Sequence, residues 1–171
     1  KNKVMSSTTK GLILGLILVA ISVIMQLFIT DIAKMQQYSW ISYLLIIGGL
    51  VWACFTYAKE MGGNVTFGNV FAHGFKTTAV FTIIALLFTI LSVTVLFPEM
   101  KDKAMEMART QMEADGKLTE TQIDQAIGMT QKFFIPFAIG GVLIGYLLLG
   151  AIGSLIGAAI AKKNPNPTPF Q

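Results

Sequence analysis

Four long apolar runs fill most of the 171-residue chain. Each is close to the length of about 20 residues that a helix needs to cross the hydrocarbon core of a bilayer, and none contains a charged residue in its interior. Inside hydrocarbon a span must pair its own backbone groups, and the runs lack the polar–apolar alternation of a membrane β-strand. The sequence therefore predicts an all-α membrane protein. Its four transmembrane helices are expected at about residues 11–30, 40–58, 77–97 and 133–161 of a single membrane domain, 1–171.

Composition agrees with a membrane protein. Hydrophobic residues make up 54% of the chain and charged residues only 13%, whereas a soluble domain carries about a quarter charged residues. The first run is longer than the apolar part of a signal peptide, and residues 28–31 do not match a small-residue cleavage site. We therefore expect this run to be retained as a span.

The charges of the loops predict an orientation. With four spans, both tails and the second connection, 59–78, share one side, which collects seven basic residues and one acidic residue. The third connection, 98–132, holds five basic and seven acidic residues. Because cytoplasmic loops carry an excess of Lys and Arg, both termini are expected in the cytoplasm and 98–132 outside.

The third connection, 98–132, is predicted to form helices outside the four spans. Pro98 suits a first helical turn, Gly116 supplies a stop, and Thr119 with Gln122 forms a capping-box pattern. The segment is either an amphipathic helical hairpin outside the membrane or two extensions of spans three and four. A Met stripe on its first helix indicates helix packing or, as the alternative, adaptable partner binding.

The second connection contains the candidate contact site. Gly62 and Gly63 permit a turn, and Thr66 can cap a helix whose aromatic side chains share one face. We expect a short amphipathic helix at the cytoplasmic interface, with a helix leading directly into span three as the alternative. Contact with lipid headgroups or a partner is predicted for Lys59, Gly62, Gly63, Phe67, Gly68, Phe71, His73 and Lys76. The rival interpretation is a linker whose aromatic residues only anchor span three.

Small residues recur at helical spacing in the first and fourth spans. Such surfaces let helix backbones approach closely, so we predict glycine-zipper packing inside the bundle. A homo-oligomer interface and a gating helix are the alternatives. The residues concerned are Gly11, Gly15, Gly141, Gly145, Gly150, Gly153 and Gly157.

The sequence contains few residues that could catalyse a reaction or bind a metal ion. His73 is the only histidine and is expected to be solvated at the interface, and Cys54 is the only cysteine and is expected to pack as a small apolar residue. Nucleophile–base pairs and metal sites need several such groups, so no catalytic, metal or cofactor-binding residue is predicted, and no cofactor. The net charge of +4 arises mainly at span ends, so nucleic acid is not expected as a partner.

Three motifs carry a resemblance. Gly-Gly-x-x-Thr-Phe-Gly-x-x-Phe-x-x-Gly-Phe begins at Gly62, Phe-Pro-Glu at Phe97 and Gly-Lys-Leu-Thr-Glu-Thr-Gln-Ile at Gly116. With the four spans they resemble, over about residues 5–163, a bacterial membrane family catalogued as domain of unknown function 4199. The resemblance implies a bacterial inner-membrane protein without an assigned activity, with a membrane glycosyltransferase as a candidate partner. The family commonly has Asp before Pro-Glu, whereas this chain has Phe97, which weakens any role built on that acid.

Function divides into three classes. The favoured class is a non-enzymatic inner-membrane subunit or scaffold that binds membrane lipids and a partner protein or lipid-linked intermediate. A small transporter or lipid scramblase, using glycine-lined helix motion and a Thr/Ser path, is the alternative. An intramembrane enzyme is the least favoured.

Overall fold

The computed structural model describes residues 4–29, 32–162 and 164. This part of the chain contains six α-helices and one π-helical turn, and no strand. Four helical segments are long and apolar enough to cross a membrane: Ser7–Phe28, Gln37–Glu60, Phe67–Leu96 and Phe134–Ile160. The elements are α1 (Ser7–Phe28), α2 (Ile32–Glu60), α3 (Phe67–Leu91), η1 (Ser92–Leu96), α4 (Glu99–Asp115), α5 (Glu120–Lys132) and α6 (Phe134–Ile160).

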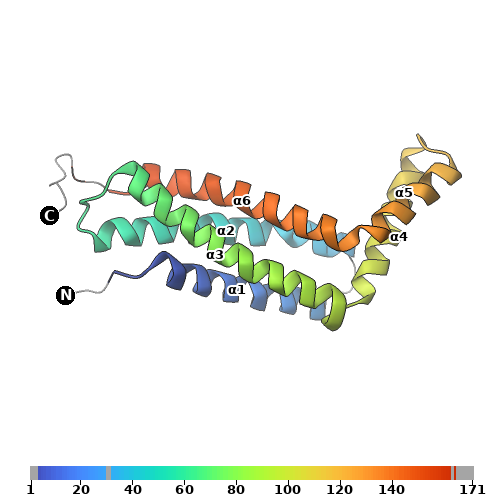
Figure 1. Ribbon diagram of the computed structural model, residues 1–171, viewed down its shortest axis with the longest axis horizontal. Coiled ribbons are helices and arrows are strands. Elements are labelled where there is room, and N and C mark those ends of the chain that lie inside the picture. The colour runs from blue at the N-terminus through green and yellow to red at the C-terminus, as the bar shows by residue number, and fades with distance from the viewer. Residues whose placement is uncertain (1–3, 30–31, 163, 165–171) are drawn as a thin grey trace.

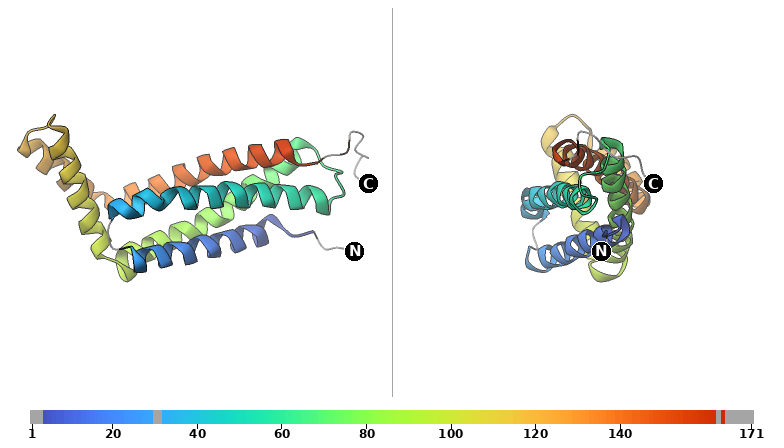
Figure 2. Two further views of the ribbon diagram at one scale, coloured as in Figure 1. Left: turned by 180° about the vertical axis from the view of Figure 1, so that it is seen from behind. Right: turned by 90° about the vertical axis from the view of Figure 1, so that its left-hand side faces the viewer.

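The four long helices lie side by side in an elongated bundle (Figure 1). The start of α1, the α2–α3 turn and the end of α6 lie at one end, and α4 and α5 extend from the other. Helix α3 is central, because it packs most extensively against both α6 and α1, while α2 packs mainly against α6. Figure 2 shows the bundle from behind and from the end that carries the α2–α3 turn.

Two clusters of buried side chains form the core. One combines Leu18, Ile46, Leu50 and Phe81 in the middle of the bundle. The other surrounds Cys54 near the α2–α3 turn. Many other large apolar side chains face outward, for example Leu87 and Ile144, which are 65% and 64% exposed. An apolar exterior of this extent matches a lipid environment.

The predicted caps at Thr66 and Thr119 and the predicted glycine turn at Gly62 and Gly63 are confirmed. The Thr66 side chain accepts a hydrogen bond from the Asn69 backbone N–H at 3.2 Å, and the Thr119–Gln122 capping box is formed. Gly62 and Gly63 have φ values of 63° and 76°, which glycine adopts without steric cost. Local sequence chemistry therefore determines where α3 and α5 begin.

Two predicted connections are partly helical instead. Helix α2 already begins at Ile32, so most of 30–40 belongs to it. Helix α3 runs unbroken from Phe67 to Leu91, so the prediction of a separate interfacial helix is wrong and the alternative of direct entry into span three holds. No proline interrupts this stretch, and Gly74 lies where α3 closely approaches Cys54 and Ser154.

The segment 98–132 forms two separate helices rather than extensions of the neighbouring spans. Span three ends in the π-helical turn η1, where the Phe97 N–H donates to the Ser92 carbonyl at 2.7 Å. The chain then turns at Pro98 into α4, and α5 is separated from α6 at Phe133. Helices α4 and α5 pack against each other and are tilted steeply from the bundle (Figure 1). We call this pair, residues 99–132, the α4–α5 arm.

The glycines of α6 belong to two faces. A Cβ at Gly153 would lie 3.0 Å from Leu50 Cδ1, and one at Gly157 would lie 2.7 Å from Cys54 Cβ. Gly150 closely approaches Thr78, and Gly11 and Gly15 closely approach Val80 and Ile84. The prediction of packing inside the bundle is wrong for Gly141 and Gly145, where a Cβ would meet nothing within 4 Å. At 3.6 residues per turn, the step from Gly145 to Gly150 rotates about 140° around the axis, so the two sets face different directions.

Candidate functional site

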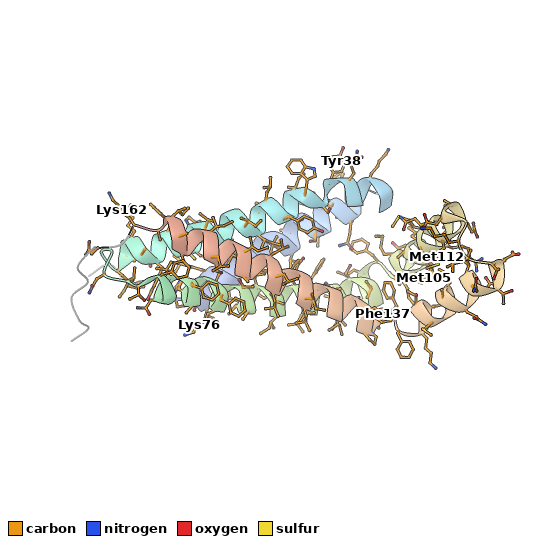
Figure 3. The ribbon with its side chains drawn as sticks, turned by 90° about the horizontal axis from the view of Figure 1, so that it is seen from above. Tyr38, Lys76, Met105, Met112, Phe137 and Lys162 are labelled. Atoms are coloured by element: carbon orange, nitrogen blue, oxygen red, sulfur yellow. The ribbon has the colours of Figure 1, made fainter. Side chains whose placement is uncertain are left out.

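The predicted contact segment divides into an outward and an inward part. Lys59 and Lys76 are exposed, and Figure 3 shows Lys76 pointing away from the bundle. The rings of Phe67, Phe71 and Phe75 follow one another along α3 with centroid distances of 6.5 and 5.8 Å. Phe67 is 44% exposed, whereas Phe71 also packs against the Cys54 cluster. The outward part therefore combines two cations with a row of aromatic rings.

The turn between α2 and α3 is held by the chain that follows α6. The Asn164 backbone N–H donates to the Gly63 carbonyl at 2.9 Å, and the Asn164 side-chain amide donates to the Gly62 carbonyl at 3.2 Å. Gly68 plays no comparable role, since a Cβ there would meet only Thr66 Oγ1, at 3.9 Å. Gly62 and Gly63 thus shape the turn, while Gly68 is not required by packing.

His73 faces inward, so the expectation of a solvated histidine is wrong. Its ring stacks on Tyr57 of α2 with a centroid distance of 4.1 Å and an interplanar angle of 10°. Its Nε2 atom is buried and has no hydrogen-bond partner among the described residues. The cause is the early start of α3, because the helical register then places His73 beside Gly74 and Thr77 on the inner side of the helix.

Lys10 is a site residue that sequence reasoning missed. Its side chain is fully buried, and its Nζ donates to the Ala53 carbonyl at 3.2 Å and lies 3.5 Å from Glu60 Oε2. The same Glu60 oxygen accepts from the Met5 backbone N–H at 3.0 Å. Lys10 lies in the first turns of α1 and Glu60 ends α2, so opposite helix directions bring them to one end. That topological relation was the signal that could have identified the pair.

The contacts at this end tie the helices together. The Lys10–Glu60 pair joins α1 to α2, the Tyr57–His73 stack joins α2 to α3, and Asn164 joins the segment after α6 to the turn. The Lys10 ammonium and the Glu60 carboxylate are each engaged by the other, so loss of either partner would leave a charge without its counter-charge. Among the described residues, no group of three or more His, Cys, Asp or Glu side chains is placed to hold a metal ion.

The α4–α5 arm at the other end of the bundle is held by ionic contacts. Arg109 of α4 forms a hydrogen-bonded ion pair with Asp124 of α5 and lies 3.7 Å from Glu113. The hydrogen bond and charge of Asp124 raise the pKa of Arg109 above its ordinary value. Ile123 of α5 is buried, and the methionines of the predicted stripe on α4, Met100, Met107 and Met112, are half-buried. Figure 3 shows Met112 on the arm. Met129 on α5 is 63% exposed.

The fold defines the class: an α-helical protein with four helices long and apolar enough to span a membrane and a separate helical pair between the third and fourth. The family described as "Protein of unknown function (DUF4199)" matches residues 9–163, and the chain belongs to that family. No curated protein and no solved structure matches the chain.

Proposed function

We propose that this protein is a non-enzymatic subunit or scaffold of a bacterial inner membrane that binds a partner protein through the α4–α5 arm. The observation that carries this proposal is the shape of the chain. The arm is a separate pair of helices that leaves the bundle (Figure 1) and touches α2, η1 and α6 only near its base.

The charges of the arm favour a location outside the hydrocarbon and outside the cell. It holds seven of the nine acidic residues of the chain. A charged residue at the bilayer centre costs at least about 2.5 kcal/mol, so a segment with twelve of them belongs in water. The positive-inside rule then assigns both termini to the cytoplasm. The arm in this arrangement is an extramembrane hairpin on the outer face.

Exposed apolar side chains give the arm a surface for a protein partner. Met129 on α5 and Leu118 before it are 63% and 42% exposed, and Phe133 and Phe137 at the start of α6 are 43% and 57% exposed. Methionine and aromatic residues are enriched at protein interfaces. A partner with an apolar patch would match these side chains, and the net negative charge of 98–132 favours basic groups on that partner. A membrane glycosyltransferase is one candidate, and a lipid-linked intermediate is the alternative occupant.

The test is site-specific photocrosslinking in native membranes. A photoreactive amino acid replaces Met129 or Leu118 in the arm, and the controls carry it at Leu87 or Val95 on span three, which are 65% and 66% exposed. We expect one reproducible protein adduct from the arm positions and only lipid adducts from the controls. Lipid adducts alone from all four positions would contradict a protein partner. A pure homo-oligomer on purification in mild detergent would favour a transporter or scramblase.

A further inference from the structure

A cavity with a mainly apolar lining and a few uncharged polar groups lies within the spans, close to the point where α3 becomes η1. Its volume is about 230 Å³, and it is lined by residues of α1, α3 and η1, with Met100 of α4 and Tyr146 of α6 completing the wall. A second cavity of about 160 Å³ lies on the α2 side of the same part of α1. Ser22 and Gln26 line both cavities. The two cavities therefore adjoin around one polar stretch of α1.

The polar groups of the lining are uncharged hydroxyl and amide groups. Ser92 Oγ and Gln26 Oε1 are 2.6 Å apart, and the Thr89 hydroxyl donates to the Ala85 carbonyl at 2.8 Å. A primary amide has two donor hydrogens besides its oxygen, so Gln26 can donate to a ligand while its oxygen accepts from Ser92. None of the residues that line either cavity is Asp, Glu, Lys, Arg or His.

The lining determines which ligand chemistry fits. An ion placed here would lose its hydration without a counter-charge, at a cost of several kcal/mol. An uncharged hydroxyl group loses much less and can bond to the amide and hydroxyl groups present. The remaining lining side chains, including Leu18, Val19, Phe88 and Val93, are apolar and suit hydrocarbon. A neutral amphiphile matches both halves of the lining.

Local structure supports a binding role. A π-helical turn widens the helix and occurs frequently at functional sites, and η1 begins at Ser92, whose side chain bonds to Gln26. Ser22, Gln26, Phe88 and Thr89 are half-buried, so the cavity is accessible from outside the protein. Met100 lies in the first turn of α4, so the wall of the cavity includes the base of the arm.

We infer that this cavity binds the head of an uncharged, hydroxyl-bearing lipid, of the diacylglycerol or long-chain alcohol class. The volume accommodates the hydroxyl-bearing head, and the acyl chains remain in the bilayer. This site shares no residue with the exposed arm surface. The inference therefore goes beyond the proposed function, and the two can be tested independently.

The test counts lipids bound to the detergent-solubilised protein by native mass spectrometry. The probe is dioleoylglycerol, and the comparison is trioleoylglycerol, which has no hydroxyl. Wild type is expected to bind dioleoylglycerol saturably and to prefer it to trioleoylglycerol. Equal affinity for the two lipids, or no binding of dioleoylglycerol, would overturn the inference without any variant.

Two variants localise the binding. Gln26→Leu and Ser92→Ala remove polar groups of the lining, and each is expected to weaken dioleoylglycerol binding by about tenfold, as loss of a hydrogen bond in a buried site does. Thr94→Val is the matched control, because Thr94 lies in the same π-helical turn but is exposed and outside the lining. Wild-type affinity in folded Gln26→Leu and Ser92→Ala would overturn the assignment.

Discussion

At the scale of single residues, the Lys10–Glu60 pair has the largest structural consequence. Lys10 is completely buried and Glu60 is partly exposed, and the carboxylate also accepts from the Met5 backbone. Removing one partner of a buried pair leaves an uncompensated charge, while replacing both partners is often nearly neutral. The pair is therefore expected to hold the start of α1 against the end of α2. The contribution of each residue to the free energy of unfolding should depend strongly on the presence of the other.

A double-mutant cycle tests this dependence. Glu60→Gln should lower the free energy of unfolding by about 3 kcal/mol, because it leaves Lys10 buried without its counter-charge. The double variant Lys10→Met/Glu60→Gln should recover most of that loss. Reversible unfolding in detergent is measured for Glu60→Gln, Lys10→Met and the double variant, and Glu113→Gln on the exposed arm serves as the control. A loss in the double variant equal to the sum of the losses in the two single variants would contradict this dependence.

The outward part of the candidate site gives a second prediction at this scale. Basic residues near an anionic surface contribute about 1 kcal/mol each, so Lys59→Gln/Lys76→Gln should weaken binding to dioleoylphosphatidylglycerol by about 2 kcal/mol, or roughly thirtyfold. Adding Phe67→Ala should weaken it further, and Phe71 is left unchanged because it packs against the core. The control Lys101→Gln/Lys103→Gln lies at the other end. Unchanged lipid binding by the folded variants would leave the segment as an anchor for span three.

The sequence predicted some of these residues and not others, for a physical reason. Lys59 and Lys76 could be identified because a basic residue at a span end faces water in most arrangements. Lys10 belongs to the same pattern, and its burial depends on Glu60, which lies 50 residues away. His73 was predicted as exposed, and this was wrong because its environment depends on the register of α3, which the sequence pattern did not specify. Side-chain direction at a helix end follows from tertiary packing, which the local pattern does not contain.

At the scale of helices, close approach at glycine explains how the bundle packs. Gly74, Gly150 and Gly157 lie where α3, α6 and α2 come into contact around Cys54, Thr78 and Ser154. In a bilayer, such contacts replace the hydrophobic driving force that packs soluble helices. The half of α6 nearer the arm has glycines of the same spacing, Gly141 and Gly145, without such contacts.

This difference predicts that a leucine destabilises the protein at one position of α6 and has almost no effect on stability at another. Gly153→Leu should destabilise the protein by about 1–3 kcal/mol, because the side chain would meet Leu50 and Ile47 in a filled space. Gly145→Leu should leave the melting temperature in detergent nearly unchanged, since nothing lies within 4 Å. Thermal unfolding of both variants decides the point. A similar loss at both positions would indicate that Gly145 packs against a second copy.

Helix ends were more predictable than helix faces. Thr66, Gly116 and the Thr119–Gln122 pair each act within a few residues of themselves, so their roles follow from local chemistry. The π-helical turn at Ser92–Leu96 and the division of the α6 glycines have no such local signature. Both depend on which neighbouring helix is present, which the order of the spans does not specify.

At the scale of the whole molecule, the four spans could be predicted from length and hydropathy, while their arrangement could not. The central place of α3 between α1 and α6 and the tilt of the arm result from side-chain fit along the entire bundle. We propose that the two ends of the bundle lie on opposite sides of the membrane, with the polar arm outside and the end that carries the Lys10–Glu60 pair on the cytoplasmic side.

Thiol labelling in intact cells tests this assignment most directly. Asp115→Cys places a thiol at the tip of the arm and Lys162→Cys places one after α6, both at exposed positions. Wild type is the control, because its cysteine, Cys54, is buried. A membrane-impermeant maleimide should label Asp115→Cys in intact cells and Lys162→Cys only after the inner membrane is opened. Labelling of Lys162→Cys in intact cells, with Asp115→Cys protected, would contradict the orientation and the role proposed for the arm.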